Sequence, residues 1–221
     1  MYGKITSLRF QKHTPDRVNV YLDDRFAFGL PAVIAASLRV GQVLSDGEVE
    51  QLQSVDAEQK VYDRAVRFLS YRPRSVAELQ RHLMQAGIPE ATVDAAVERL
   101  RQQGYLDDAE FARFWVESRQ RFKPRGERAL RQELRQKGLD AATIATATSG
   151  LDAAALAYDA ARSRAIRLAS LAQSDPMAFR QKLSSHLLRR GFDYEVIREV
   201  LARLLQEFGA GEQVSLGSDE E

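Results

Sequence analysis

One spacing recurs three times along this chain and constrains its fold more than any other feature. Leu79, Leu83 and Gly87 stand four residues apart, and two further triplets repeat the pattern: Leu130, Leu134 and Gly138, then Leu183, Leu187 and Gly191. Leucines four residues apart lie on one helical face, and glycine ends a helix because it takes the left-handed turn at little cost. Three copies in register predict tandem copies of one helical unit.

The residues around the first triplet predict where the helices of a unit begin and end. Ser75 and Glu78 have the spacing of a capping box, so a helix is expected to start after Ser75. Pro89 suits the first turn of the next helix, because its missing N–H would have no partner there. That helix carries an apolar stripe formed by Val93, Val97 and Leu100.

Composition excludes several classes of protein. No apolar run approaches 18 residues and no signal-peptide region precedes the first strand pattern, so we expect a cytoplasmic protein without membrane contact. The absence of cysteine excludes disulfides, thiolate zinc sites and a cysteine nucleophile. The histidines, His13, His82 and His186, accompany no motif that pairs a nucleophile with a base. We therefore predict no enzyme activity, no cofactor and no metal site, and we expect a monomer because no heptad seam is present.

Residues 1–55 predict a small module that differs from the rest. Strand patterns cover 4–11 and 18–22, and Asp23-Asp24-Arg25 predicts a tight hairpin turn. An antiparallel sheet of two or three strands is expected, covered by a helix over 31–38. Ser45 and Glu48 form a second capping box, which opens a helix through about Gln53. The segment is interpreted as a docking or stabilising module.

The helical part divides into three predicted units: repeat one (57–106), repeat two (107–150) and repeat three (151–208), followed by an acidic tail (209–221) that is expected to be disordered. The first helix of repeat two carries an aromatic stripe that we assign to the core, namely Phe111, Phe114, Trp115 and Phe122. The predicted fold class is mainly α, with a small β-containing module before three three-helix repeats.

Charge is distributed unevenly, although the chain has a formal net charge of only +1. Residues 1–59 carry 6 basic and 8 acidic side chains (−2), residues 60–139 carry 17 and 11 (+6), and residues 140–221 carry 9 and 12 (−3). A basic middle favours an anionic partner. The alternative is coding bias, because the 26 arginines greatly outnumber the 6 lysines.

The basic residues gather in two places. Repeat two holds five cations within ten residues, and further arginines continue along the next helix; the set is Arg119, Arg121, Lys123, Arg125, Arg128, Arg131 and Arg135. Around the corresponding helix of repeat one lie Arg72, Arg74 and Arg81. These ten residues form the predicted basic face, which could bind phosphates or carboxylates through guanidinium forks. The alternative is a solvated face held by pairs such as Glu127–Arg131.

Several motifs in this order resemble the RecX family of bacterial regulatory proteins. They are Tyr71-Arg-Pro-Arg-Ser75, Glu78-Leu79, Leu83, Gly87, Gly104-Tyr-Leu-Asp-Asp108, Phe111-Ala112, Gly126, Glu133-Leu134 and Lys137-Gly138. The resemblance covers about residues 57–208 and is most specific over 71–138. The strand segment at the beginning resembles a β-hairpin extension that some members carry.

The resemblance implies three tandem three-helix units in an elongated, curved array. It also implies binding in the groove of the RecA filament on single-stranded DNA, with the DNA contacted directly or through the filament. Inhibition of RecA ATP hydrolysis, strand exchange and assisted cleavage of the SOS repressor would follow, which places the chain in homologous recombination and DNA repair.

A second reading remains open, in which the helical units bind DNA directly in the manner of a helix-turn-helix protein. A recognition helix presents its first residues to the base edges. The third helix of repeat one would present Glu90, Asp94 and Glu98 there, and these charges repel phosphates. We therefore keep direct DNA binding as the alternative.

Overall fold

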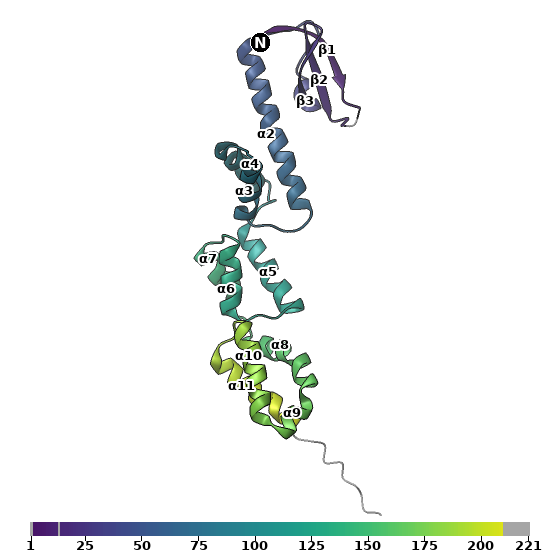
Figure 1. Ribbon diagram of the computed structural model, residues 1–221. Helices are drawn as coiled ribbons and strands as arrows, with labels where there is room; N and C mark the ends of the chain where they lie inside the picture. Colours follow the sequence, from purple (N-terminus) through teal and green to yellow (C-terminus); the bar gives the residue numbers. More distant parts are fainter. Residues whose placement is uncertain (1, 13, 210–221) are drawn as a thin grey trace, which may run out of the picture. The chain divides into compact units, whose positions relative to one another are not determined.

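The computed structural model describes residues 2–12 and 14–209 and is mainly helical (Figure 1). It divides after Leu106 into two compact units. The first unit holds the strand module and repeat one, and the second holds repeats two and three. The predicted fold class is confirmed, while the curved array stays a prediction. His13 and the tail residues 210–221 lie outside the described residues.

The strand module is a four-stranded antiparallel sheet in the order β3-β2-β1-β4, made of β1 (Gly3–Phe10), β2 (Arg17–Leu22), β3 (Arg25–Pro31) and β4 (Val43–Leu44). Asp23 and Asp24 form the predicted tight turn with φ of 46° and 64°. Aspartate tolerates this left-handed conformation, and two such residues match the twist of a hairpin. Arg25 already belongs to β3, so the turn is one residue shorter than predicted. The sequence reading missed β4, which has only two residues.

The helix predicted to begin after Ser45 and the first helix of repeat one are a single continuous helix, α2 (Asp46–Ser70). The capping box of Ser45 and Glu48 is present, but the predicted end near Gln53 is wrong. Residues 48–70 contain neither glycine nor proline, so nothing local interrupts the helix. Val49 packs in the core of the sheet, whereas Val61 packs in the core of repeat one. The helix α1 (Ala32–Ala35) is shorter than expected.

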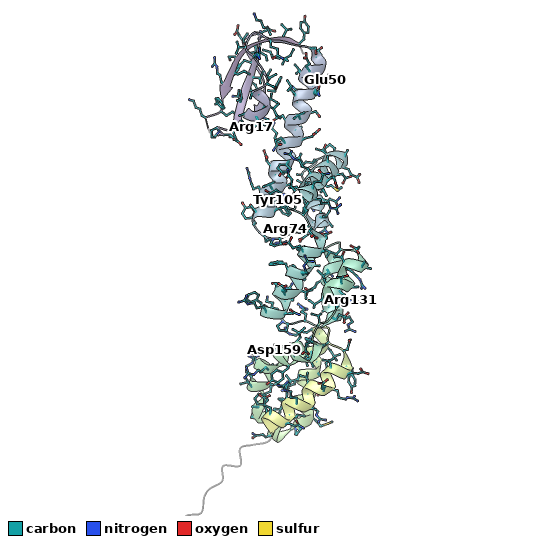
Figure 2. The ribbon with its side chains drawn as sticks, turned by 180° about the vertical axis from the view of Figure 1, so that it is seen from behind. Arg17, Glu50, Arg74, Tyr105, Arg131 and Asp159 are labelled. Carbon is teal, nitrogen blue, oxygen red and sulfur yellow. The ribbon has the colours of Figure 1, made fainter. Side chains whose placement is uncertain are left out.

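A buried carboxylate ties α2 to the sheet. Asp56 is only 5% exposed and pairs with Arg17 of β2, at 2.5 Å, and with Lys60 one turn further along, at 2.7 Å. Figure 2 labels Arg17 on the sheet beside the helix. A buried charge is tolerated only when such partners surround it. The pair therefore fixes where the sheet meets α2.

Repeat one is completed by α3 (Val76–Gln85) and α4 (Glu90–Gln102). Ser75 and Glu78 form the predicted capping box at the start of α3, and Leu79 and Leu83 are fully buried. The glycines of the three leucine–glycine triplets, Gly87, Gly138 and Gly191, each follow the helix that carries the two leucines and have φ of 77°, 86° and 82°. Only glycine takes this region freely, which explains the recurrent spacing.

Repeat two consists of α5 (Asp108–Phe122), α6 (Glu127–Gln136) and α7 (Ala141–Thr148). Phe111 is buried and Trp115 packs partly against the same core. Phe114 and Phe122 are 44% and 71% exposed, so assigning the whole aromatic stripe to the core was wrong. The stripe is wider than the face that α6 and α7 cover.

Repeat three has one helix more than predicted: α8 (Ala153–Arg167), α9 (Ala169–Ser174), α10 (Pro176–Arg189) and α11 (Tyr194–Gly209). Asp175 caps α10 and Pro176 occupies its first turn, where a missing backbone N–H costs nothing. The core of this repeat includes Phe179, Leu183 and Phe192. The short α9 packs against α10 and α11 through Ala172.

Candidate interface for an anionic partner

Glu133 on α6 organises the basic residues of repeat two. Its Oε2 accepts hydrogen bonds from Nε1 of Trp115, at 2.8 Å, and from Nε of Arg119, at 2.7 Å. Its Oε1 lies 3.0 Å from Nε of Arg125. The side chain of Glu133 is only 17% exposed, so these contacts are partly shielded from water. Two residues of the predicted basic face are therefore held by a carboxylate of their own repeat.

An open hollow lies where α6 of repeat two approaches the end of α10 in repeat three, and we call it the arginine groove. Its volume is about 340 Å³, and Arg125, Arg128 and Arg189 bring guanidinium groups to it. Gln132 and Gln136 on α6 add amide groups to the lining. Arg189 was absent from the predicted basic face, because it comes from a different repeat, 61 residues after Arg128.

A close approach of two backbones lies beside the arginine groove. Gly126 donates its N–H to the carbonyl of Arg190 at 2.9 Å, and Nη1 of Arg190 donates to the carbonyl of Pro124 at 3.0 Å. Burial lowers the pKa of Arg190, and nearby Arg125 lowers it further. A Cβ atom on Gly126 would lie 2.1 Å from the carbonyl oxygen of Gly191. Glycine is therefore required at position 126 for the two repeats to meet.

The other predicted residues of repeat two do not line this groove. Arg131 pairs with Glu127 at 2.8 Å, which is the pair named as the alternative, and its Nε also donates to the hydroxyl of Thr148 at 3.3 Å. Arg121 stacks over the ring of Phe122. Lys123 follows the last residue of α5, and Arg135 is exposed on α6. Of the predicted residues of repeat two, Arg125 and Arg128 are thus the two that line the arginine groove.

Two of the three predicted arginines of repeat one have local partners. Arg72 forms two hydrogen bonds with Glu78, at 3.0 and 3.2 Å. Arg74 lies 4.0 Å from the ring centroid of Phe68, and burial is the main reason that its pKa is lowered. Arg81 is exposed on α3. That these three share one face with repeat two stays a prediction.

One position in each repeat joins the helix that carries the two leucines to the first helix of that repeat. It lies five residues before the final glycine, and its occupants are His82, Glu133 and His186. His82 stacks on Phe68 of α2 with 3.9 Å between ring centroids, and Nε2 of His186 lies 3.2 Å from the carbonyl oxygen of Ala160 in α8. The leucine–glycine spacing identifies Glu133 as the equivalent of the two histidines, but it does not show which residues Glu133 contacts.

Repeat three should lose stability in mild acid because of His186. Burial lowers the pKa of His186, the hydrogen bond to Ala160 opposes this, and Arg190, Arg164 and Arg189 lower it further. The unfolded chain then binds a proton more readily than the folded chain, so stability falls as the pH drops below about 6.5. Melting temperature at pH 7.5 and 5.5 should differ more for the natural chain than for His186→Gln. Equal differences would contradict this prediction.

Neither a metal site nor a membrane-spanning helix is found among residues 2–12 and 14–209. These residues contain no group of three His, Asp or Glu side chains placed to hold a metal ion. None of their helices has both the length and the apolar character that crossing a membrane requires.

Comparison with known proteins matches four family models along the chain. They are the RecX N-terminal domain (residues 3–45) and the first, second and third RecX three-helix domains (62–100, 107–147 and 155–201). A regulatory protein RecX of Bacillus licheniformis is 31% identical over 199 residues, which is 89% of this chain and 76% of that protein. The corresponding protein of Bacillus subtilis is 30% identical, over 92% of this chain and 78% of its own length.

Solved structures agree with these matches. A crystal structure of regulatory protein RecX superposes with a TM-score of 0.72 and 27% identity, covering 89% of this chain and 98% of that one. RecX from Lactobacillus salivarius shares the fold with a TM-score of 0.60 and 23% identity, over 67% of this chain and 97% of its own. Because its four domains match the RecX models in order and its sequence is 31% identical to a RecX relative, the chain belongs to the RecX family of regulatory proteins.

Proposed function

We propose that this chain binds in the groove of the RecA filament on single-stranded DNA. There it modulates, and mainly inhibits, RecA ATP hydrolysis, strand exchange and co-protease activity. The arginine groove is the observation that carries this proposal. Arg128 and Arg189 are both exposed, and neither forms an ion pair with any carboxylate in the described part of the chain. Two unpaired guanidinium groups beside a hollow are suited to an anionic partner.

A filament offers two kinds of anion to such a groove, the phosphates of the DNA and carboxylates of RecA. The planar guanidinium fork binds either of them with two parallel hydrogen bonds. Because the backbones at Gly126 and Gly191 lock repeats two and three together, the arginines of both repeats approach the partner as one preorganised set. Preorganisation reduces the entropy lost on binding.

Inhibition follows if the chain contacts neighbouring RecA subunits at the same time. Contacts made by several repeats would tether these subunits to one another. ATP turnover in a filament requires the subunits to move, so a ligand that binds one arrangement better than the others slows the cycle. The repeats thus serve as a series of attachment points rather than as a catalyst.

ATP hydrolysis by RecA on single-stranded DNA tests this proposal when the chain is added at well below the RecA concentration. We expect inhibition at these substoichiometric amounts, because a chain that acts on the filament affects many subunits. Inhibition only in excess over the DNA would indicate simple competition for single strands. If the chain has no effect on ATP hydrolysis, the proposed function is wrong, although the description of the fold still holds.

The salt dependence of binding to free single-stranded DNA provides a control. Three phosphate contacts by the arginine groove would give a slope of roughly −2 for the logarithm of affinity against that of salt. A much shallower slope, with inhibition of RecA retained, would indicate that the arginines contact carboxylates of the protein.

A further inference from the structure

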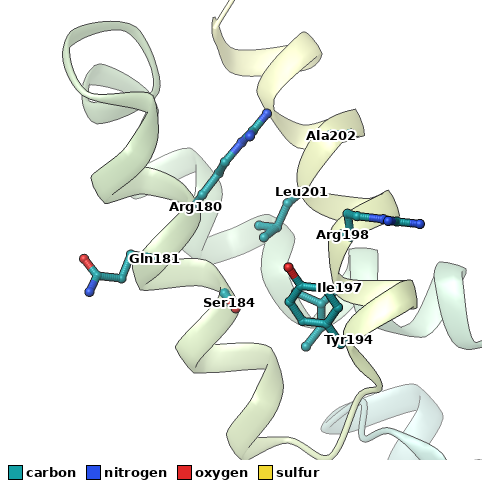
Figure 3. A pocket seen from close by; sticks show the side chains of 8 residues that line it. All are labelled: Arg180, Gln181, Ser184, Tyr194, Ile197, Arg198, Leu201 and Ala202. Atoms are coloured by element: carbon teal, nitrogen blue, oxygen red, sulfur yellow. The ribbon is translucent and has the colours of Figure 1, made fainter.

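Repeat three contains a second pocket, which lies between α10 and α11 and shares no residue with the arginine groove. Its volume is about 300 Å³. Ile197 and Leu201, which are 1% and 7% exposed, give it an apolar floor. Arg180 of α10 and Arg198 of α11 stand at its rim, with Leu201 between them (Figure 3). We call this the α10–α11 pocket.

The rim of this pocket lacks the partners that other arginines of the chain have. Arg180 and Arg198 are exposed, and no carboxylate of residues 2–12 or 14–209 forms an ion pair with either. The hydroxyls of Ser184 and Tyr194 lie in the same lining, and Tyr194 is 69% exposed. An apolar floor below two free cations and two hydroxyl groups fits a peptide that has an aliphatic side chain beside carboxylates.

Residues 210–221 of the same chain have this chemistry. They contain four acidic residues and no basic residue, namely Glu212, Asp219, Glu220 and Glu221. Val214 and Leu216 stand two positions apart between these acids, so in an extended peptide both side chains lie on one side. The segment therefore complements the pocket in charge and offers two aliphatic groups for its floor.

The segment is also long enough to reach the pocket. It continues from Gly209, the last residue of α11, which is the helix that supplies Ile197 and Leu201. Leu201 lies eight residues before that end, or about 12 Å along the helix axis. Twelve residues can span about 40 Å when extended, so the segment can turn back along α11 and pass over the pocket.

We propose that residues 210–221 bind in the α10–α11 pocket of their own chain as an internal ligand. Leu216 and Val214 occupy the apolar floor, and the acidic side chains pair with Arg180 and Arg198. A tether this short gives an effective concentration of the order of millimolar, so even a weak peptide occupies the pocket for most of the time. An acidic peptide from outside must then displace the segment.

A peptide of residues 210–221 with a fluorescent label tests the proposal, with fluorescence anisotropy as the readout. The receptor is the full chain with its own segment disabled, by changing the four acids to their amides and Val214 and Leu216 to serine. We expect the labelled peptide to bind this variant at least about tenfold more tightly than the natural chain, whose pocket is already filled. Absence of binding, or equal binding to both chains, would overturn the proposal.

Variants of the rim test the position of the site. In the segment-disabled chain, Arg180→Gln with Arg198→Gln should weaken peptide binding about tenfold or more, whereas Arg167→Gln, an exposed arginine of α8, should leave it unchanged. Equal losses of affinity in the rim variant and in Arg167→Gln would mean that binding depends only on net charge, and would overturn the assignment of the site.

The oligomeric state gives a further test. If the natural chain sediments as a dimer and the segment-disabled chain as a monomer, the segment binds a second copy of the chain, which would contradict the proposal. None of these measurements involves RecA, so they are independent of the proposed function.

Discussion

Replacing Gly126 with alanine is expected to lower the stability of the unit formed by repeats two and three by about 3 kcal/mol, which is roughly 10 °C in melting temperature. The backbone at Gly126 has φ of −71°, which alanine adopts without strain. The added Cβ, however, would lie 2.1 Å from the carbonyl oxygen and 2.4 Å from the carbonyl carbon of Gly191. Both are backbone atoms, so the two repeats must separate and the Gly126–Arg190 hydrogen bond is lost.

The matched control is Gly47→Ala, in the first turn of α2. A Cβ atom there meets nothing within 4 Å, and alanine favours a helix more than glycine does. This variant should be as stable as the natural chain or slightly more stable. Thermal unfolding followed by circular dichroism compares the two. A melting temperature for Gly126→Ala within about 2 °C of the natural value would show that the junction can relax, and that its close contact is not required.

Reversing two charges in the arginine groove, Arg128→Glu with Arg189→Glu, should raise the concentration needed for half-inhibition of RecA about 100-fold, or roughly 3 kcal/mol. Both side chains are exposed and form no ion pair in the described part of the chain, so the fold should tolerate the change. Arg125 is left unchanged because it pairs with Glu133, and its reversal would place two carboxylates together. The measurement is the ATPase titration, with helical content checked by circular dichroism.

A second double variant distinguishes the contribution of the arginine groove to inhibition from that of the wider basic face. Arg135→Glu with Arg167→Glu makes the same change in net charge, on one exposed arginine of α6 and one of α8. If the groove carries the interaction, this variant should inhibit RecA within about threefold of the natural chain, a difference below 1 kcal/mol. Inhibition lost equally in both variants would support the broader face that the sequence predicts.

Features set by neighbouring residues could be predicted from the sequence. The capping boxes at Ser45 and Ser75, the aspartate turn and the three glycines that end helices all depend on a few adjacent residues. Each motif satisfies backbone groups locally, so its residue pattern is nearly sufficient to define it. The three units follow from these local signals and their repetition.

Features that depend on distant residues could not be predicted in this way. Arg189 reaches the groove only because Gly126 and Gly191 bring two repeats into contact. The spacing and the Glu133-Leu134 motif single out Glu133, but they do not show that its carboxylate holds Trp115 and two arginines. Phe122 is exposed because the neighbouring helices do not cover that part of α5. The spacing of apolar residues along a helix does not show how much of the helix its neighbours cover.

Because α2 is continuous, the number of its residues determines how the sheet is oriented relative to repeat one. Each residue of an α-helix adds about 1.5 Å and turns the chain by about 100°. One residue inserted between Val49 and Asp56 would turn the sheet by about 100° relative to repeat one, a little more than a quarter of a full turn, and would pull Asp56 away from Arg17. Seven inserted residues would return the sheet to within about 20° of its original orientation, at a position roughly 10 Å farther along the axis of α2. Over evolutionary time, this segment should therefore accept insertions and deletions in steps of nearly whole turns and reject single ones.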